Sequence, residues 1–169
     1  MLSVVTGGSG SGKSAYAEER LCSIAQGEKV YLAVMRAADE ESRARVRRHR
    51  FLRQGKGFRL VEKPLDLKEL SFSGTESVLL EDLPMLLANE MFRADGKAPK
   101  EPEEVLEELL HLERSVRDLV VVTGNLFEDG ALYDEMTSRY LEVLGGWNRQ
   151  LCRMAQERTE VVYGIPIPF

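Results

Sequence analysis

The fold is decided by the stretch Gly7-Gly8-Ser9-Gly10-Ser11-Gly12-Lys13-Ser14, which stands close to the start of the 169-residue chain. The apolar run Leu2–Thr6 precedes it and predicts a β-strand, whereas Ala15–Ala25 follows it and predicts a helix. The spacing of Gly7, four residues, and then Gly12-Lys13-Ser14 matches the Walker A pattern. Strand, glycine-rich loop and helix in this order predict a phosphate-binding loop.

The residue types of this loop suit nucleotide phosphates. Glycines let successive backbone N–H groups turn toward phosphate oxygens, and the start of the helix adds a positive dipole end. We therefore predict a nucleotide-binding set made of Gly7, Gly8, Ser9, Gly10, Ser11, Gly12, Lys13 and Ser14. Lys13 is expected to act in catalysis by reaching the β and γ phosphates, and Ser14 to bind Mg²⁺ through its hydroxyl.

A phosphate loop of this kind works with an acidic residue at the end of a neighbouring strand. Val78-Leu79-Leu80 predicts such a strand, and Glu81 and Asp82 follow it directly. We predict Glu81 as a catalytic residue and both acids as ligands of Mg²⁺. Asp82 has an alternative role, because it could cap a helix that begins near Pro84.

Further apolar runs, bounded by turn residues, predict more strands at Val30–Met35, Phe58–Val61, Leu119–Thr123 and Val161–Ile165. Helical patterns lie between them, so we expect an α/β fold. The expected architecture is a P-loop NTPase-like (RecA-like) open sheet, mostly parallel, with helices on both faces. Residues 1–169 are expected to form one domain.

Two amphipathic helices stand out. One has an apolar stripe from Tyr140 to Ala155 that should face the sheet. Gly145-Gly146 inside it is explained by close backbone packing, with the approach of a ligand as the alternative. The other carries Val105, Leu109 and Leu112, and its glutamates, Glu108 among them, are expected on a solvated face. Arg93–Pro102 is expected to be a mobile loop between two helices.

Composition narrows the function. A net charge of -5 argues against a general nucleic-acid binder, and no apolar run is long enough to span a bilayer. We expect a cytoplasmic protein, since no signal peptide is evident at Met1–Thr6. Cys22 and Cys152 lack the spacing of a metal or disulfide framework and are expected to be buried thiols.

Five arginines and one histidine gather in Arg43-Ala44-Arg45-Val46-Arg47-Arg48-His49-Arg50, with Arg53 one turn further on. Arginine forks bind phosphate in bidentate fashion, so an anion is the expected partner. The surrounding cations disfavour the imidazolium form, which leaves His49 neutral and able to act as a nucleophile or base. The alternative is that His49 is a solvated surface residue.

Taken together, these motifs resemble the bifunctional adenosylcobinamide kinase and adenosylcobinamide-phosphate guanylyltransferase family of the CobU type. The resemblance spans nearly the whole chain and rests on the following segments: the P-loop, Tyr31-Leu32-Ala33, Arg45–Arg50, Glu62-Lys63-Pro64-Leu65-Asp66-Leu67, Leu79–Leu83, Asn89, Phe92, Val121-Val122-Thr123 and Gly145-Gly146-Trp147-Asn148.

The resemblance implies a role in cobalamin (vitamin B12) biosynthesis. Adenosylcobinamide would be phosphorylated with ATP or GTP, and GMP would then pass from GTP to adenosylcobinamide phosphate, giving adenosylcobinamide-GDP. It implies that His49 is the nucleophile carrying the guanylyl group, and that Arg50, Arg53 and Glu62 contact the nucleotide. It also implies a homotrimer with active sites between subunits.

The chain departs from the family pattern at Thr123–Gly130, at Ser138–Glu142 and at Asn148-Arg149. Two alternatives therefore stay open. One is a catalytically reduced GTP-binding paralogue with a regulatory or assembly role, and the other is a P-loop small-molecule kinase without guanylyltransferase activity.

Overall fold

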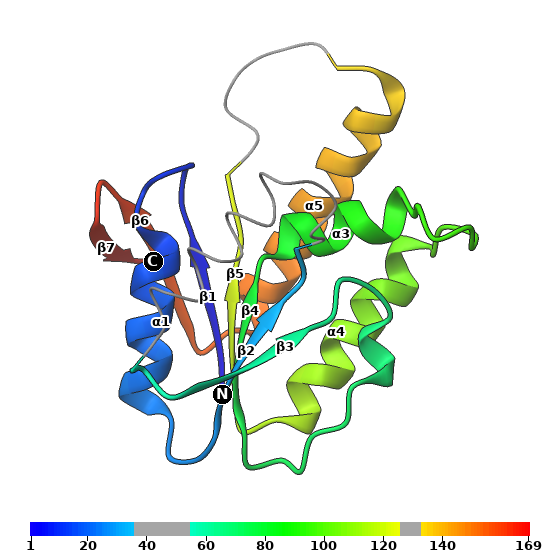
Figure 1. Cartoon of the computed structure of the whole chain (residues 1–169). Coiled ribbons are helices and arrows are strands. Elements are labelled where there is room, and N and C mark those ends of the chain that lie inside the picture. The colour runs from blue at the N-terminus through cyan, green and yellow to red at the C-terminus, as the bar shows by residue number, and fades with distance from the viewer. Residues whose placement is uncertain (36–54, 126–132) are drawn as a thin grey trace.

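The computed structural model describes residues 1–35, 55–125 and 133–169, which contain a seven-stranded sheet (Figure 1). Its strands, in spatial order, are β3 (Phe58–Glu62), β2 (Lys29–Ala33), β4 (Ser77–Glu81), β5 (Asp118–Val122), β1 (Leu2–Thr6), β6 (Glu157–Val162) and β7 (Ile165–Pro168). All neighbouring pairs from β3 to β6 are parallel, and β7 pairs with β6 in antiparallel fashion. The predicted α/β class is confirmed.

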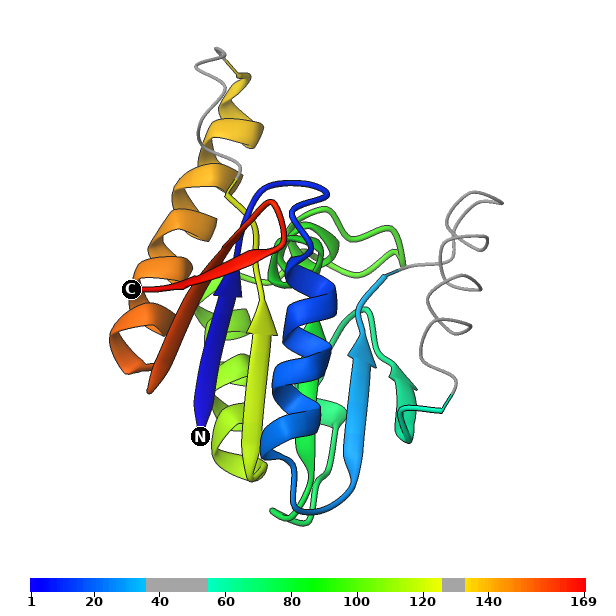
Figure 2. The same cartoon turned by 90° about the vertical axis from the view of Figure 1, so that its left-hand side faces the viewer.

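Helices cover both faces of the sheet. Helix α1 (Lys13–Ile24) lies on one face, and α3 (Leu83–Met91), α4 (Pro102–Ser115) and α5 (Glu135–Met154) lie on the other (Figure 2). A short 3-10 helix, η1 (Leu67–Glu69), packs beside α4. This is the layered, P-loop NTPase-like arrangement that the alternating strand and helix patterns predicted.

The strands are apolar on successive residues because each one supplies two cores. Val4 packs into the larger core with α3, α4 and α5, whereas its neighbour Val5 packs into the smaller core with Ala17 and Leu21 of α1. Side chains alternate between the faces of a strand, and here both faces are buried. Each fully buried Val or Leu contributes about 1.5–3 kcal/mol of transfer free energy, so these central strands are strong anchors for the loops at their ends.

The prediction of a single last strand was wrong, because two strands joined by a turn stand there. Val161–Ile165 is not one strand, because the chain reverses at Tyr163 and Gly164, which have φ values of 49° and 79°. Positive φ at both central residues defines the tight hairpin turn that matches strand twist. The apolar run hid this turn, since only Gly164 in it is a turn residue.

Two helix predictions also need correction. Glu108 is buried rather than solvated, because it pairs with Lys100. A Cβ added at Gly146 would meet no atom within 4 Å, so close packing does not explain that glycine. The stripe of α5 does bury Leu144, Trp147 and Leu151, as expected.

The remaining structural predictions have mixed outcomes. The loop after α3 joins it to α4, but the side chains of Arg93 and Lys100 are held in ion pairs. Cys22 and Cys152 are both free thiols and only partly buried. In residues 1–35, 55–125 and 133–169, no helix has the length and apolarity needed to cross a membrane.

Candidate nucleotide site

The predicted phosphate loop connects β1 to α1 at the carboxyl end of the parallel strands. Gly12 stands before α1 with a left-handed φ of 92°, and its carbonyl accepts a hydrogen bond from the Tyr16 N–H at 3.1 Å. The Lys13 ammonium folds back to the Gly8 carbonyl at 3.1 Å. The first turn of α1 contains no acidic residue, so its N-terminal N–H groups suit an anion.

The glycines of the loop are needed for different reasons. Gly7 has a φ of 152°, and a Cβ there would lie 2.5 Å from the Val161 carbonyl oxygen of β6. Gly10 has a φ of 72° and faces open space. Gly7 therefore permits close packing on β6, and Gly10 permits a backbone turn that L side chains rarely adopt.

Glu81 is the last residue of β4, which places it beside the phosphate loop. Its Oε1 accepts a short hydrogen bond from the Ser14 hydroxyl, and its Oε2 accepts one from the Tyr31 hydroxyl at 2.8 Å. Tyr31 is buried on β2, and its ring meets Phe58 edge-on. The structure thus brings Ser14 and Glu81 together, as predicted, and adds Tyr31, a positioning hydroxyl that sequence reasoning missed.

Asp82 caps α3. One carboxylate oxygen accepts the Met85 N–H at 2.9 Å, so the capping alternative is confirmed. Burial raises the pKa of Asp82, the neighbouring Glu81 raises it further, and the Met85 N–H and Lys13 act in the opposite direction. Its predicted role as a metal ligand stays a prediction.

Glu62 lies at the carboxyl end of β3. Register places both Glu62 and Glu81 opposite Ala33, one on each side of β2. The two acids therefore share the edge of the sheet at which the phosphate loop also lies. Whether Glu62 contacts a nucleotide stays a prediction.

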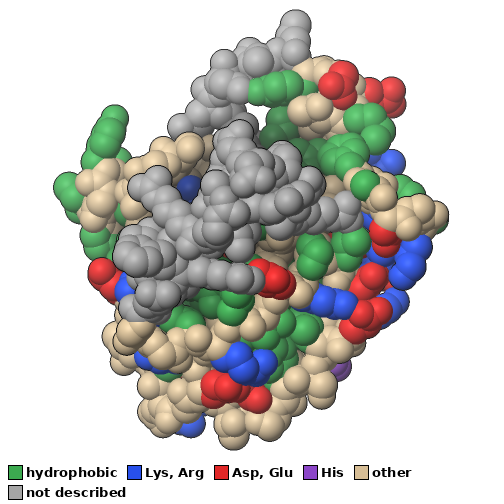
Figure 3. All heavy atoms as spheres, in the orientation of Figure 1, with side chains coloured by type: hydrophobic (Ala, Val, Ile, Leu, Met, Phe, Trp, Pro, Cys, Tyr) green, Lys and Arg blue, Asp and Glu red, His purple; other side chains and the backbone are tan. Residues whose placement is uncertain are grey.

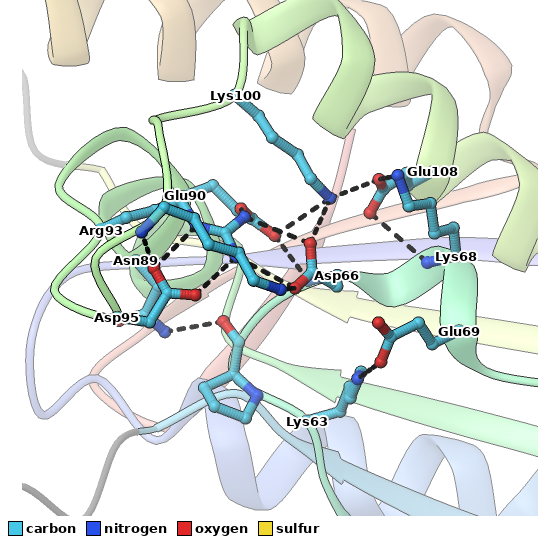
Figure 4. Close-up of polar contacts among 12 residues, drawn as sticks. Lys63, Asp66, Lys68, Glu69, Asn89, Glu90, Arg93, Asp95, Lys100 and Glu108 are labelled. Carbon is cyan, nitrogen blue, oxygen red and sulfur yellow. Dashed lines mark hydrogen bonds and ion pairs between the residues drawn. The ribbon is translucent and has the colours of Figure 1, made fainter.

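An ion-pair network, which sequence reasoning missed, fixes the segment after Glu62 (Figure 4). The fully buried Glu90 of α3 accepts the Asp66 N–H at 2.6 Å and the Arg93 guanidinium at 2.8 Å. Arg93 also binds Asp66 and Asp95, and Lys100 binds Asp66 and Glu108. In the sequence these residues looked like ordinary charged positions of a loop and two helices, so no local pattern could have identified the network.

These pairs shift the protonation of the carboxyl groups. Hydrogen bonds from Arg93 and then Lys100 hold the pKa of Asp66 well below its usual range. Hydrogen bonding from Arg93 lowers the pKa of Asp95 to about 2. Asn89 supports the same region, because its side-chain amide donates to the carbonyls of Val34 at 2.7 Å and Pro64 at 3.1 Å.

A cavity of about 330 Å³ lies between the phosphate loop and the β6–β7 hairpin. Its walls are residues Gly8 to Ser11 of the loop, Asn125 at the end of β5, and Glu160 to Tyr163 of the β6–β7 hairpin. Figures 1 and 2 both place this hairpin beside the phosphate loop. His49, Arg50 and Arg53 fall in the segment 36–54, outside the described residues.

Fold and phosphate loop together define an α/β protein of the P-loop class. The family model described as cobinamide kinase / cobinamide phosphate guanyltransferase matches residues 3–169. The chain is also 30% identical to the bifunctional adenosylcobalamin biosynthesis protein CobU of Escherichia coli (strain K12), over 99% of this chain and 98% of that protein. The chain belongs to the cobinamide kinase / cobinamide phosphate guanyltransferase family, and the resemblance inferred from the sequence is confirmed.

Proposed function

We propose that this protein phosphorylates adenosylcobinamide with ATP or GTP and then transfers GMP from GTP to adenosylcobinamide phosphate. The observation that carries the kinase step is the arrangement of Lys13, Ser14 and Glu81 around the phosphate loop. Family membership supplies the substrate class. The corresponding role is a step in cobalamin biosynthesis.

In the first step the hydroxyl oxygen of the substrate attacks the γ-phosphorus, the bond to the β–γ bridging oxygen breaks, and the nucleoside diphosphate leaves. The loop N–H groups and Lys13 would bind the charge that builds up on the phosphate oxygens. Glu81, held by Ser14 and Tyr31, presents a carboxylate to the same site and would accept the hydroxyl proton.

The donors at this site suit Mg²⁺, because the Ser14 hydroxyl and the Glu81 carboxylate are hard oxygen groups in direct contact. No group of three or more His, Cys, Asp or Glu in the described residues could hold a metal alone. That fits an ion that takes one or two protein oxygens and completes its shell with water and phosphates. Ser14 and Glu81 would hold it, with Asp82 nearby, and when bound it would neutralise charge on the phosphates.

In the second step we propose that the His49 imidazole attacks the α-phosphorus of GTP and pyrophosphate leaves. A phosphate oxygen of adenosylcobinamide phosphate then attacks the same phosphorus, and the bond to His49 breaks. Arg50 and Arg53 would hold the phosphate oxygens during both transfers. This step rests on the sequence motif and on family membership.

The test uses purified protein, Mg²⁺ and GTP labelled at the α-phosphate. After denaturation, an acid-labile and base-stable label is expected on the wild type and on His111→Ala, but not on His49→Ala. His111 is the matched control, because it is the other histidine of the chain and is exposed on α4. A parallel assay follows γ-phosphate transfer to adenosylcobinamide.

The two assays separate the alternatives. Transfer of the γ-phosphate without any labelled protein would indicate a kinase without guanylyltransferase activity. Tight GTP binding without either reaction would indicate a catalytically reduced paralogue and would contradict the proposal.

A further inference from the structure

We propose that the base of the nucleotide bound at the phosphate loop stacks on Tyr163, at the tip of the β6–β7 hairpin. The inference rests on the proposed function for the presence of a nucleotide and adds a specificity-determining contact to it.

Within the described part of the chain, Tyr163 has no packing role that explains its position. Its side chain is 95% exposed, although tyrosine is usually half-buried or more in folded proteins. It also adopts a φ of 49°, which is uncommon for a residue other than glycine and unusual for a bulky one. An aromatic ring held outward at a tight turn is a ready platform for a flat ligand.

The turn that carries Tyr163 is fastened to the phosphate loop. The Gly164 N–H donates to the Ser11 carbonyl at 2.8 Å. A Cβ added at Gly12 would lie 3.4 Å from the Gly164 Cα, so the two backbones lie close together. The backbone that carries the Tyr163 ring is therefore held in a fixed position relative to the phosphate loop, which a stacking contact requires.

The cavity between the loop and the hairpin is lined by polar and apolar groups together. Backbone of Gly8, Ser9 and Gly10 forms one wall, and Glu160, Val162 and Tyr163 form the other. Its volume of about 330 Å³ is at the lower end of small-ligand pockets, which fits a nucleoside. The Ser11 hydroxyl is buried there without a hydrogen-bond partner among the described residues.

Strand order assigns the two ends of the triphosphate. The phosphate loop follows β1, Glu81 ends β4 on one side of β1, and the hairpin lies on the opposite side of β1. A triphosphate in the cradle whose γ end meets Ser14 and Glu81 extends its other end away from them. The hairpin is the described element on that other side, and Tyr163 is its exposed aromatic residue at the cavity.

The test compares ligands with and without a base. Calorimetric titration of the full chain with ATP, GTP and inorganic tripolyphosphate, in Mg²⁺, is done for the wild type, Tyr163→Ala, Tyr163→Phe and Phe169→Ala. Base–aromatic stacking predicts that Tyr163→Ala weakens ATP and GTP binding by about 5-fold to 100-fold. Tripolyphosphate binding is expected to change less than about twofold, because it has no base to stack.

The controls separate stacking from other effects. Tyr163→Phe keeps the ring and is expected to bind like the wild type, and so is Phe169→Ala, which removes an exposed aromatic ring from the same hairpin outside the cavity. An equal loss for all three ligands would overturn the proposal, since the hairpin would then only support the loop. Loss of self-association by Tyr163→Ala in sedimentation, paralleling the loss of binding, would overturn it as well.

The outcomes also distinguish this inference from the proposed function. Unchanged ATP and GTP binding by Tyr163→Ala would refute the stacking contact alone. Failure of the wild type to bind either nucleotide would refute both.

Discussion

The carboxylate of Glu81 accepts hydrogen bonds from the hydroxyl groups of two separate elements, Ser14 of α1 and Tyr31 of β2. Each of its oxygens has its own donor, so the orientation of the group is set before any substrate arrives. Prepositioned charge of this kind costs no rearrangement at the moment of reaction. Tyr31 is a positioning residue in this arrangement, because it acts through Glu81.

Replacement of Tyr31 by phenylalanine is expected to slow nucleotide turnover. Hydrogen bonds to charged groups are worth about 1.5–3 kcal/mol, so loss of this one should lower kcat by about 10-fold to 150-fold, with little effect on KM. The ring and its edge-on contact with Phe58 remain, so the fold should be kept. Steady-state kinetics checks the rate, and an unchanged kcat would show that Glu81 needs only Ser14.

At the scale of elements, α3 and α5 begin in the same way. Asp82 accepts the Met85 N–H at the start of α3, and Asp134 accepts the Thr137 N–H at the start of α5. Both satisfy a helix N–H that has no partner within the helix. Only Asp82 adjoins Glu81, so the two caps allow stability to be separated from catalysis.

Asp82→Ala and Asp134→Ala are each expected to lower the free energy of unfolding by about 1 kcal/mol. Asp82→Ala should in addition reduce turnover, because it removes a carboxylate beside Glu81, whereas Asp134→Ala should leave turnover unchanged. Urea denaturation and the kinase assay measure the two effects. Equal kinetics for both variants would restrict Asp82 to capping.

Gly146→Ala is expected to stabilise the protein. Gly146 lies inside α5, where glycine costs about 1 kcal/mol relative to alanine, and the added methyl group would meet no atom within 4 Å. The midpoint of urea denaturation should therefore rise. A fall would mean that another molecule approaches this glycine, as in the trimer that the family resemblance implies.

At the scale of the whole molecule, the network around Arg93 joins three segments that are distant in sequence. Asp66 follows β3, Glu90 belongs to α3, and Glu108 belongs to α4. The side chain of Arg93 is only 2% exposed. Buried pairs of this kind are costly to break, since the remaining charge loses its partner.

Arg93→Met is expected to lower the free energy of unfolding by about 3–5 kcal/mol. The matched control is Arg59→Met, because Arg59 pairs with Glu28 while 45% of its side chain is exposed, and its loss should cost less than about 1 kcal/mol. Similar losses in urea denaturation would contradict a special role for the network.

The same network makes the stability of the fold depend on pH in the acid range. The pKa of Asp66 is lower in the folded protein than in the unfolded chain, so its contribution is complete above the unfolded value of about 3.9 and is lost as the pH falls below it. The unfolding free energy of the wild type should therefore decrease below about pH 4. Arg93→Met should show a shallower decrease in the same titration, and parallel curves would contradict this assignment.

The sequence by itself determined the α/β class, the phosphate loop, the placement of Ser14 and Glu81 near one another and the family. These follow from local rules: apolar runs mark buried strands, glycine spacing marks a phosphate cradle, and the carboxyl ends of parallel strands meet at one edge. The roles proposed for His49, Arg50 and Arg53 rest on the sequence motif and on family membership, because these residues lie outside the described residues.

Only the tertiary structure decided the hairpin at Tyr163, the hydroxyl of Tyr31 on Glu81 and the network around Arg93. The burial of Glu108 belongs to the same group, because a carboxylate on a helix looks solvated until its partner, here Lys100 on another segment, is known. The last three of these share one physical reason, because each depends on which distant segments meet, and neither residue type nor spacing along the chain contains that information. The hairpin is local, but the sequence marks its turn only by Gly164 inside an apolar run.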